Sequence, residues 1–195
     1  MATTDRQAFG GASRTWRTRD IVVVAVIGVA FGVVFWAWGI VYRGAAPAFL
    51  AAPWAQDLLY GVWLMPAILA PLIVRKPGAA LFAEIVAAGL SALLGSQWGV
   101  DALVSGVLQG LGAEVVFLAT GYRRYGFAVL AIAALGSATA AWIHDWVLYY
   151  AATDPLIQVL RGIAMGISAV VFAAWGSILL ARSLRETGVL QGFPE

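Results

Sequence analysis

Six long runs of mainly apolar residues dominate this 195-residue chain and restrict it to folds that cross a membrane. A helix needs about 20 residues to cross a hydrocarbon core ~30 Å thick, and each run is close to that length. The chain is 62% hydrophobic and only 11% charged, whereas about a quarter of the residues in a typical soluble domain are charged. We therefore predict an all-α membrane protein, a six-transmembrane-helix bundle over residues 20–42, 57–74, 77–94, 100–122, 126–150 and 155–182.

The basic residues predict how this bundle is oriented. If the chain crosses six times, Arg43 and Arg161 face one side, and the other ten of the 12 Lys and Arg residues face the opposite side. Basic residues are in excess in cytoplasmic loops, so both termini are expected in the cytoplasm. The chain then divides into a cytoplasmic N-terminal segment (1–19), a six-helix membrane domain (20–182) and a cytoplasmic tail (183–195). The ten are Arg6, Arg14, Arg17, Arg19, Arg75, Lys76, Arg123, Arg124, Arg182 and Arg185.

Polar side chains interrupt several of the predicted spans. Glu84 lies on the third, Gln109 and Glu114 on the fourth, and His144 and Asp145 near the outer end of the fifth. A charged group in hydrocarbon costs several kcal/mol, so such residues face the bundle interior or a wet cavity. We expect an outward-facing ligand pocket lined by them. Helical periodicity adds Ser91 to the stripe of Glu84, and Trp142 and Tyr149 to the stripe of Asp145.

Aromatic residues crowd the outer half of the predicted bundle. Trp36 ends the first span, Trp63 begins the second, and Trp142 and Tyr149 lie on the fifth. One interpretation is an aromatic belt at the membrane interface. The other is a stacking site for a flat or cationic ligand, which a nearby carboxylate would complement.

Each polar residue also has a structural interpretation. Glu84 and Glu114 could be paired within the bundle, and Gln109 could bond across helices. Asp145 and Arg161 could form an ion pair. His144 is the only histidine, so it cannot build a histidine metal site and could serve structure alone.

Catalytic and nucleotide-binding motifs are missing from the sequence. There is no cysteine and no G-x-x-x-x-G-K-[ST], H-E-x-x-H or G-x-S-x-G motif. We therefore expect no enzyme activity and no cofactor, with energy for any uptake supplied by another protein. The alternatives are a stand-alone proton-coupled carrier using Glu84 or Glu114 and, less favoured, a small membrane enzyme using paired carboxylates.

Two stretches carry a family resemblance: "RKPGAALFAEIVAAGLSALLGSQWG" and "GVLQGLGAEVVFLATGYRRYG", which begin at Arg75 and Gly106. They resemble the YkoE family, the substrate-binding S components of energy-coupling factor (ECF) vitamin transporters. The similarity extends to "YGVWLMP", Asp145, Arg161 and "TGVLQG", and so covers most of the chain.

The resemblance implies a six-helix S component of the cell membrane that binds thiamin or its hydroxymethylpyrimidine moiety. It also implies partners, namely a transmembrane coupling protein and a pair of cytosolic ATPases. Trp63, Glu84, Gln109, Glu114 and Asp145 stand where the family has matching residues. Ser91 is a departure, because the family tends to carry a second Glu there. Since Ser cannot neutralise a cation, a neutral pyrimidine becomes a more serious candidate ligand.

The resemblance further implies that small residues of the first span dock the coupling protein. Ala25, Gly28 and Gly32 are spaced i, i+3 and i+7 and form one smooth stripe. Small residues allow close helix approach in lipid. The alternative is that the stripe packs against the protein's own sixth span. We also expect the loop over residues 43–56, the longest outer connection, to act as a lid over the pocket.

Overall fold

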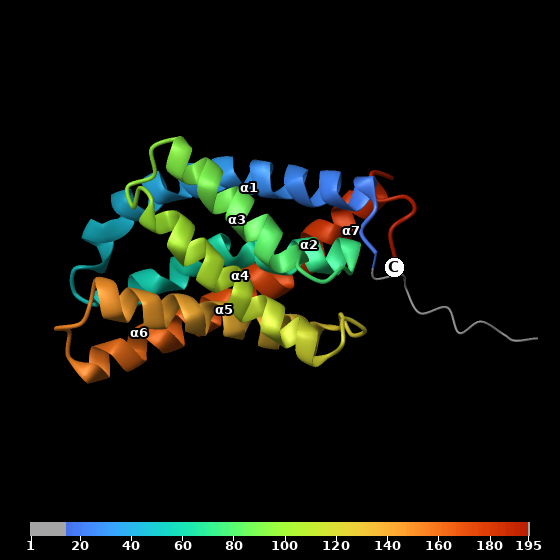
Figure 1. The fold of residues 1–195 in the computed structure, drawn as a ribbon. Helices are drawn as coiled ribbons and strands as arrows, with labels where there is room; N and C mark the ends of the chain where they lie inside the picture. Colours follow the sequence, from blue (N-terminus) through green and yellow to red (C-terminus); the bar gives the residue numbers. More distant parts are fainter. Residues whose placement is uncertain (1–14, 195) are drawn as a thin grey trace, which may run out of the picture.

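The computed structural model describes residues 15–194 and is a bundle of helices (Figure 1). Within that range the chain crosses the bundle six times, which confirms the predicted fold, with boundaries that differ from the predicted ones by a few residues. Most of the predicted N-terminal segment, including Arg6 and Arg14, lies outside the described residues. The helices are α1 (Thr18–Ala45), η1 (Ala46–Phe49), η2 (Pro53–Leu64), α2 (Met65–Val74), α3 (Ala79–Leu93), α4 (Asp101–Ala119), α5 (Phe127–Leu148), α6 (Pro155–Ser168), η3 (Ala169–Gly176) and α7 (Ser177–Glu186).

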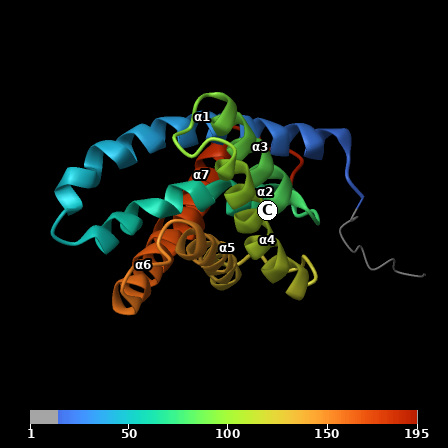
Figure 2. The same cartoon turned by 60° about the vertical axis from the view of Figure 1, so that its left-hand side comes forward.

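Five of the crossings are long and apolar enough to span a membrane, and α3, with 15 residues, is a shorter apolar helix. The second crossing joins η2 to α2, and the sixth joins α6, η3 and α7. Figure 2 shows the second crossing passing between α1 and the adjacent α5 and α6. It is therefore the central element of the bundle.

The second crossing changes its helical type half-way. Its first 12 residues form the 3₁₀-helix η2, and its last 10 form the α-helix α2. Such long 3₁₀ runs are uncommon, and they leave backbone groups at the junction without their α-helical partners. Pro66, in the first turn of α2, has no N–H to donate. The junction must therefore obtain hydrogen bonds from neighbouring helices.

Close contacts at glycines hold the crossings together. A Cβ atom on Gly61 of η2 would lie 2.2 Å from the Ser168 carbonyl oxygen, so only glycine allows η2 to approach α6 this closely. The Ser168 hydroxyl accepts the Gly61 N–H at 2.8 Å and donates to the Leu58 carbonyl at 2.6 Å. The 3₁₀ segment is thereby fixed to the sixth crossing.

The small-residue stripe of α1 lies inside the bundle. A Cβ atom on Gly28 would lie 2.6 Å from the Val86 Cβ, and one on Gly32 would lie 2.7 Å from the Leu90 Cβ. Gly28 and Gly32 are buried, and Ala25 is half-buried. Because α3 packs against the two glycines, their arrangement favours the intramolecular alternative, and docking of the coupling protein by this stripe stays a prediction. The intramolecular partner is the third crossing and not the sixth.

Both described ends of the chain lie at one end of the bundle (Figure 1). The Arg19 guanidinium lies 4.8 Å from the centre of the Phe193 ring, and Lys76 Nζ lies 3.8 Å from an oxygen of Asp20. The turn between α2 and α3 therefore shares this end with both termini. That arrangement agrees with the even number of crossings; the cytoplasmic location of this end stays a prediction.

Candidate functional site

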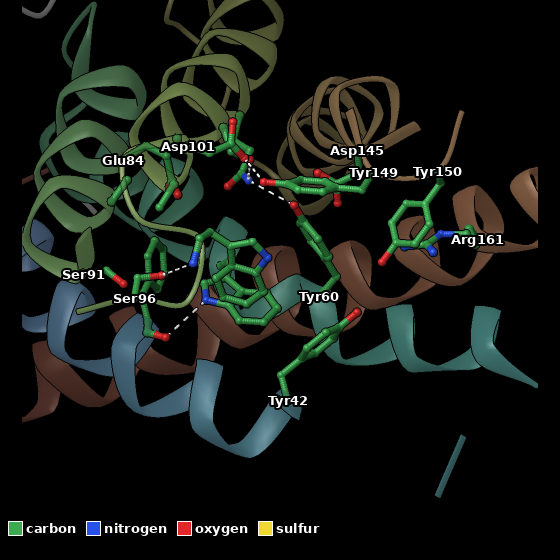
Figure 3. Close-up of a pocket in the computed structure, with 18 residues that line it drawn as sticks. Tyr42, Tyr60, Glu84, Ser91, Ser96, Asp101, Asp145, Tyr149, Tyr150 and Arg161 are labelled. Carbon is green, nitrogen blue, oxygen red and sulfur yellow. Dashed lines mark hydrogen bonds between the residues drawn. The ribbon is translucent and has the colours of Figure 1, made fainter. Parts of the chain in front are cut away.

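A pocket opens at the opposite end of the bundle, where η2, α3, α4, α5 and α6 converge (Figure 3). Its empty space, counted with the open region at its mouth, is about 760 Å³. Six of the residues predicted to bind ligand line it: Trp63, Glu84, Ser91, Gln109, Asp145 and Tyr149. The other lining residues are Phe35, Tyr42, Tyr60, Ala88, Ser96, Trp98, Asp101, Ala102, Ser105, Gly106, Tyr150 and Arg161.

One wall of the pocket consists of aromatic rings arranged around Trp63. The rings of Tyr42, Tyr60 and Trp98 lie 5.1, 5.4 and 5.2 Å from its ring, centre to centre, all near edge-to-face. This is the preferred geometry of aromatic pairs. Trp63 is 7% exposed, so the wall is part of the core and not a belt facing lipid. The wall therefore presents a rigid aromatic surface to the cavity.

Glu84 and Gln109 lie at the bottom of the pocket and complete the junction between η2 and α2. The Glu84 carboxylate accepts the Ala67 N–H at 3.1 Å, and so caps the first turn of α2. With the Gln109 amide oriented to satisfy its neighbours, Nε2 donates to Glu84 Oε1 and to the Trp63 carbonyl, both at 3.2 Å. Its oxygen then accepts from the Ser105 hydroxyl at 2.7 Å. The polar atoms exposed by the 3₁₀-to-α change are thus bonded by pocket residues.

A carboxylate cluster lies at the mouth of the pocket. His144 is buried behind it, with Nδ1 3.0 Å from Asp145 and Nε2 3.2 Å from Asp101. The Tyr149 hydroxyl donates to the other oxygen of Asp101. Burial, followed by the neighbouring Asp101 carboxylate, raises the pKa of the Tyr149 hydroxyl, so the phenol stays protonated and able to donate.

Arg161 forms an ion pair with Asp57, at 3.0 Å between Nε and Oδ2. Its guanidinium also lies 3.3 Å from the centre of the Tyr150 ring, and the Tyr42 hydroxyl donates to Asp57 at 3.3 Å. The alternative of an Asp145–Arg161 ion pair is therefore wrong. Asp57 is the first residue of the predicted second span, and nothing in the local sequence indicates that it pairs with a residue 104 positions away.

Among the pocket charges, acidic groups prevail. Glu84, Asp101, Asp145 and Arg161 line the cavity, and Arg161 is already neutralised by Asp57. Of the remaining carboxylates, Asp101 and Asp145 contact His144. The pocket therefore favours a ligand that carries positive charge or several N–H donors.

Four residues predicted to bind ligand do not line the pocket. Trp36 lies on the outer face of α1 and is 38% exposed. The Trp142 indole packs beside Gly162 and donates to the Gln158 carbonyl. Glu114 accepts the N–H groups of residues 78, 80 and 81 and the Tyr122 hydroxyl, so it caps α3 at the far end of the bundle. His144 is not a lining residue; its polar contacts to the pocket are with Asp145 and Asp101.

The site also contains residues that sequence reasoning did not select. They are Tyr42, Tyr60, Trp98 and Asp101, which all line the cavity. The signal that could have found Asp101 is its place at the same membrane level as Asp145. The predicted lid contributes no lining residue from positions 43–56; instead the connection between α3 and α4 provides Ser96 and Trp98.

Known proteins resemble this chain over nearly its whole length. Residues 19–140 match a family model described as the permease component of an ABC-type cobalt transport system. A Bacillus subtilis (strain 168) protein, YkoE, whose name gives HMP/thiamine permease as its proposed role, is 38% identical over 180 residues. That alignment covers 92% of this chain and 89% of the relative.

A solved structure resembles the fold equally well. A crystal structure of an S component of an ECF transporter superposes with a TM-score of 0.87 at 37% identity. The match covers 91% of this chain and 90% of the other. Although the family description mentions cobalt, no group of three His, Cys, Asp or Glu side chains within residues 15–194 is placed to hold a metal ion.

Proposed function

The chain belongs to the YkoE family of S components of ECF transporters, and from that premise we propose that it captures thiamin or its hydroxymethylpyrimidine moiety. As a member it is a multi-pass membrane component of a transporter and not an enzyme. The ligand would be its transported cargo, and the chain would need no cofactor.

The observation that carries the proposal is the aromatic wall facing an acidic set of side chains. Trp63 and its neighbours offer ring faces, and Glu84, Asp101 and Asp145 offer acceptors. Thiamin combines a cationic thiazolium with a flat aminopyrimidine that donates hydrogen bonds. Aromatic faces attract cations, and carboxylates accept from amino groups. Both halves of thiamin thus have complementary groups in one pocket.

The same charges argue against phosphorylated ligands. Among the described residues that line the cavity, Arg161 is the one cationic side chain, and Asp57 already holds it. A phosphate ester would bring negative charge beside three acids without a free cation to receive it. Free thiamin or the free pyrimidine is therefore the better cargo. The serine at position 91 removes one carboxylate relative to the family pattern, but Asp101 supplies another at the same pocket.

Transport would require partners. We propose that a transmembrane coupling protein and two cytosolic ATPases supply the energy, because the sequence contains no phosphate-binding loop. The chain would then act as the binding subunit of an ECF-type importer.

Ligand identification tests the proposal directly. The purified protein is denatured and the released small molecules are identified by mass spectrometry. Calorimetry then compares thiamin, hydroxymethylpyrimidine and thiamin monophosphate on ligand-free protein. We expect thiamin or the pyrimidine to copurify, and the monophosphate to bind at least tenfold more weakly than thiamin. Equal binding of the monophosphate, or no binding of either free compound, would contradict the proposal.

A further inference from the structure

His144 lies between two carboxylates that belong to different helices. Its Nδ1 is 3.0 Å from Asp145 on α5, and its Nε2 is 3.2 Å from Asp101 at the start of α4. The histidine is 7% exposed, whereas both acids line the pocket. His144 therefore acts on any ligand through the two acids.

These two contacts require one more proton than a neutral histidine carries. A neutral imidazole has a single N–H, so it can donate to one carboxylate while its other nitrogen turns a lone pair toward the second. Both contacts are favourable when the ring carries two protons, or when one acid is protonated. The Asp101–His144–Asp145 cluster thus holds an additional proton when both contacts are made.

The surrounding groups do not replace that proton. Tyr149 donates to Asp101 and has its ring 6.3 Å from the His144 ring. The Arg161 guanidinium from α6 attracts the Asp145 carboxylate electrostatically, and the Tyr60 hydroxyl from η2 forms a hydrogen bond with it. Arg161, however, is shared with Asp57, whose own charge also acts on Asp145. One histidine therefore carries the main local compensation for two acids.

We propose that His144 is a positioning residue that sets the charge of the pocket, and that a cationic ligand expels the additional proton of the Asp101–His144–Asp145 cluster when it binds. The inference rests on the proposed function, since it requires a cationic cargo. A ligand cation beside Asp101 and Asp145 repels an imidazolium and favours its deprotonation, and a poorly solvated pocket strengthens that repulsion. The positive charge of the ligand then compensates the two carboxylates in place of the released proton.

Release of a proton on binding determines how ligand affinity depends on pH. If binding releases one proton, affinity rises about tenfold for each pH unit while the cluster is protonated. Histidines change charge between about pH 5 and 8. Thiamin affinity should therefore fall as the medium is acidified through that range.

Calorimetry on the full-length protein in detergent tests this. Thiamin is titrated at several pH values between about 5.5 and 8, in buffers of different ionisation enthalpy, which gives the number of protons released. We expect the wild type to release close to one proton at the acidic end of this range. His144→Gln, which cannot hold the proton, should release none and show a nearly constant affinity. Any proton lost by thiamin itself would persist in that variant.

Asp101→Asn provides a second variant, in which a neutral ring satisfies the single remaining carboxylate, and it should also lose the proton release. Thiamin binding without proton release in the wild type, or with the same release in both variants, would overturn this inference alone. Binding of hydroxymethylpyrimidine without binding of thiamin would overturn this inference and leave the proposed function standing, whereas no binding of either compound would overturn both.

Discussion

The backbone N–H of Ala67 donates to the side chain of Glu84 at 3.1 Å, so a residue of the pocket also caps a helix that begins inside the bundle. Glu84 is fully buried. It meets the N-terminal end of α2, where the helix dipole favours negative charge. One side chain thus connects the ligand site to the backbone of the central crossing.

Replacing Glu84 separates these two tasks. Glu84→Ala leaves the Ala67 N–H without an acceptor and should lower the free energy of unfolding by about 1–3 kcal/mol. Glu84→Gln keeps an acceptor but removes the charge, so stability should change less while thiamin affinity falls. Thermal unfolding in detergent and calorimetry measure the two effects. Glu114→Gln is the matched control, because Glu114 caps α3 far from the pocket. The thiamin affinity of this variant should equal that of the wild type. Equal loss of affinity in both glutamine variants would contradict this assignment.

The position of Trp63 in the aromatic wall predicts that its replacement lowers thiamin affinity, whereas replacement of Trp36 does not. Trp63→Ala should weaken thiamin binding by about 0.5–2 kcal/mol, since it removes a ring face available to the cation. Trp36→Ala should leave affinity unchanged, because Trp36 lies on the outer face of α1. Trp142→Ala, outside the pocket, serves as a second comparison. Calorimetry on the folded fraction gives the three values. If Trp36→Ala and Trp63→Ala behave alike, the wall does not contact the ligand.

The Asp57–Arg161 pair should be costly to break. Asp57→Ala leaves a buried guanidinium without its carboxylate and should reduce the free energy of unfolding by about 3–5 kcal/mol. The double variant Asp57→Leu, Arg161→Met removes both charges and should recover most of that loss. Arg123→Gln in the exposed turn after α4 is the control for loss of a positive charge. Chemical or thermal unfolding measures whether the double variant is more stable than Asp57→Ala. Equal stability of the two would refute this prediction.

Close packing of α1 on α3 predicts a strong effect of size at position 28. Gly28→Leu forces side-chain atoms into Val86 and should cost about 1–3 kcal/mol or more through overpacking. Ala30→Leu, on the exposed face of the same helix, should be tolerated. Comparing melting temperatures of the two variants tests the packing. Should Gly28→Leu fold as stably as Ala30→Leu and lose only its association with an ATPase-bearing module, position 28 would face a partner after all.

The crossings could be predicted because hydrophobic length is a local property of the sequence. Helical periodicity also gathered Glu84, Ser91, Gln109, Asp145 and Tyr149, which the structure brings to one cavity. The periodicity of one helix does not reveal what its stripe faces, however. The stripe with Gly28 has the same small residues whether its neighbour is α3 or another protein, and only the tertiary structure decides between them.

Acidic residues near helix ends were harder to interpret. Glu114 lies within a predicted span and was predicted to bind ligand, but its carboxylate accepts hydrogen bonds from the first N–H groups of α3. Asp57 and Asp101 lie at or near the starts of predicted spans, and they pair with Arg161 and His144 across long sequence separations. In both cases the deciding partner belongs to another helix, and the order of residues along one chain does not indicate which helices become neighbours.

The 3₁₀ winding of η2 also decides how far the second crossing reaches. A 3₁₀-helix rises about 2.0 Å per residue and an α-helix about 1.5 Å. The 22 residues from Pro53 to Val74 therefore extend to roughly 39 Å, where uniform α-helix would reach about 33 Å. The neighbouring α1 needs 28 residues for about 42 Å. The second crossing therefore reaches nearly the same length as α1 with fewer residues. The two adjacent crossings can span a bilayer of the same thickness, which largely avoids hydrophobic mismatch between them.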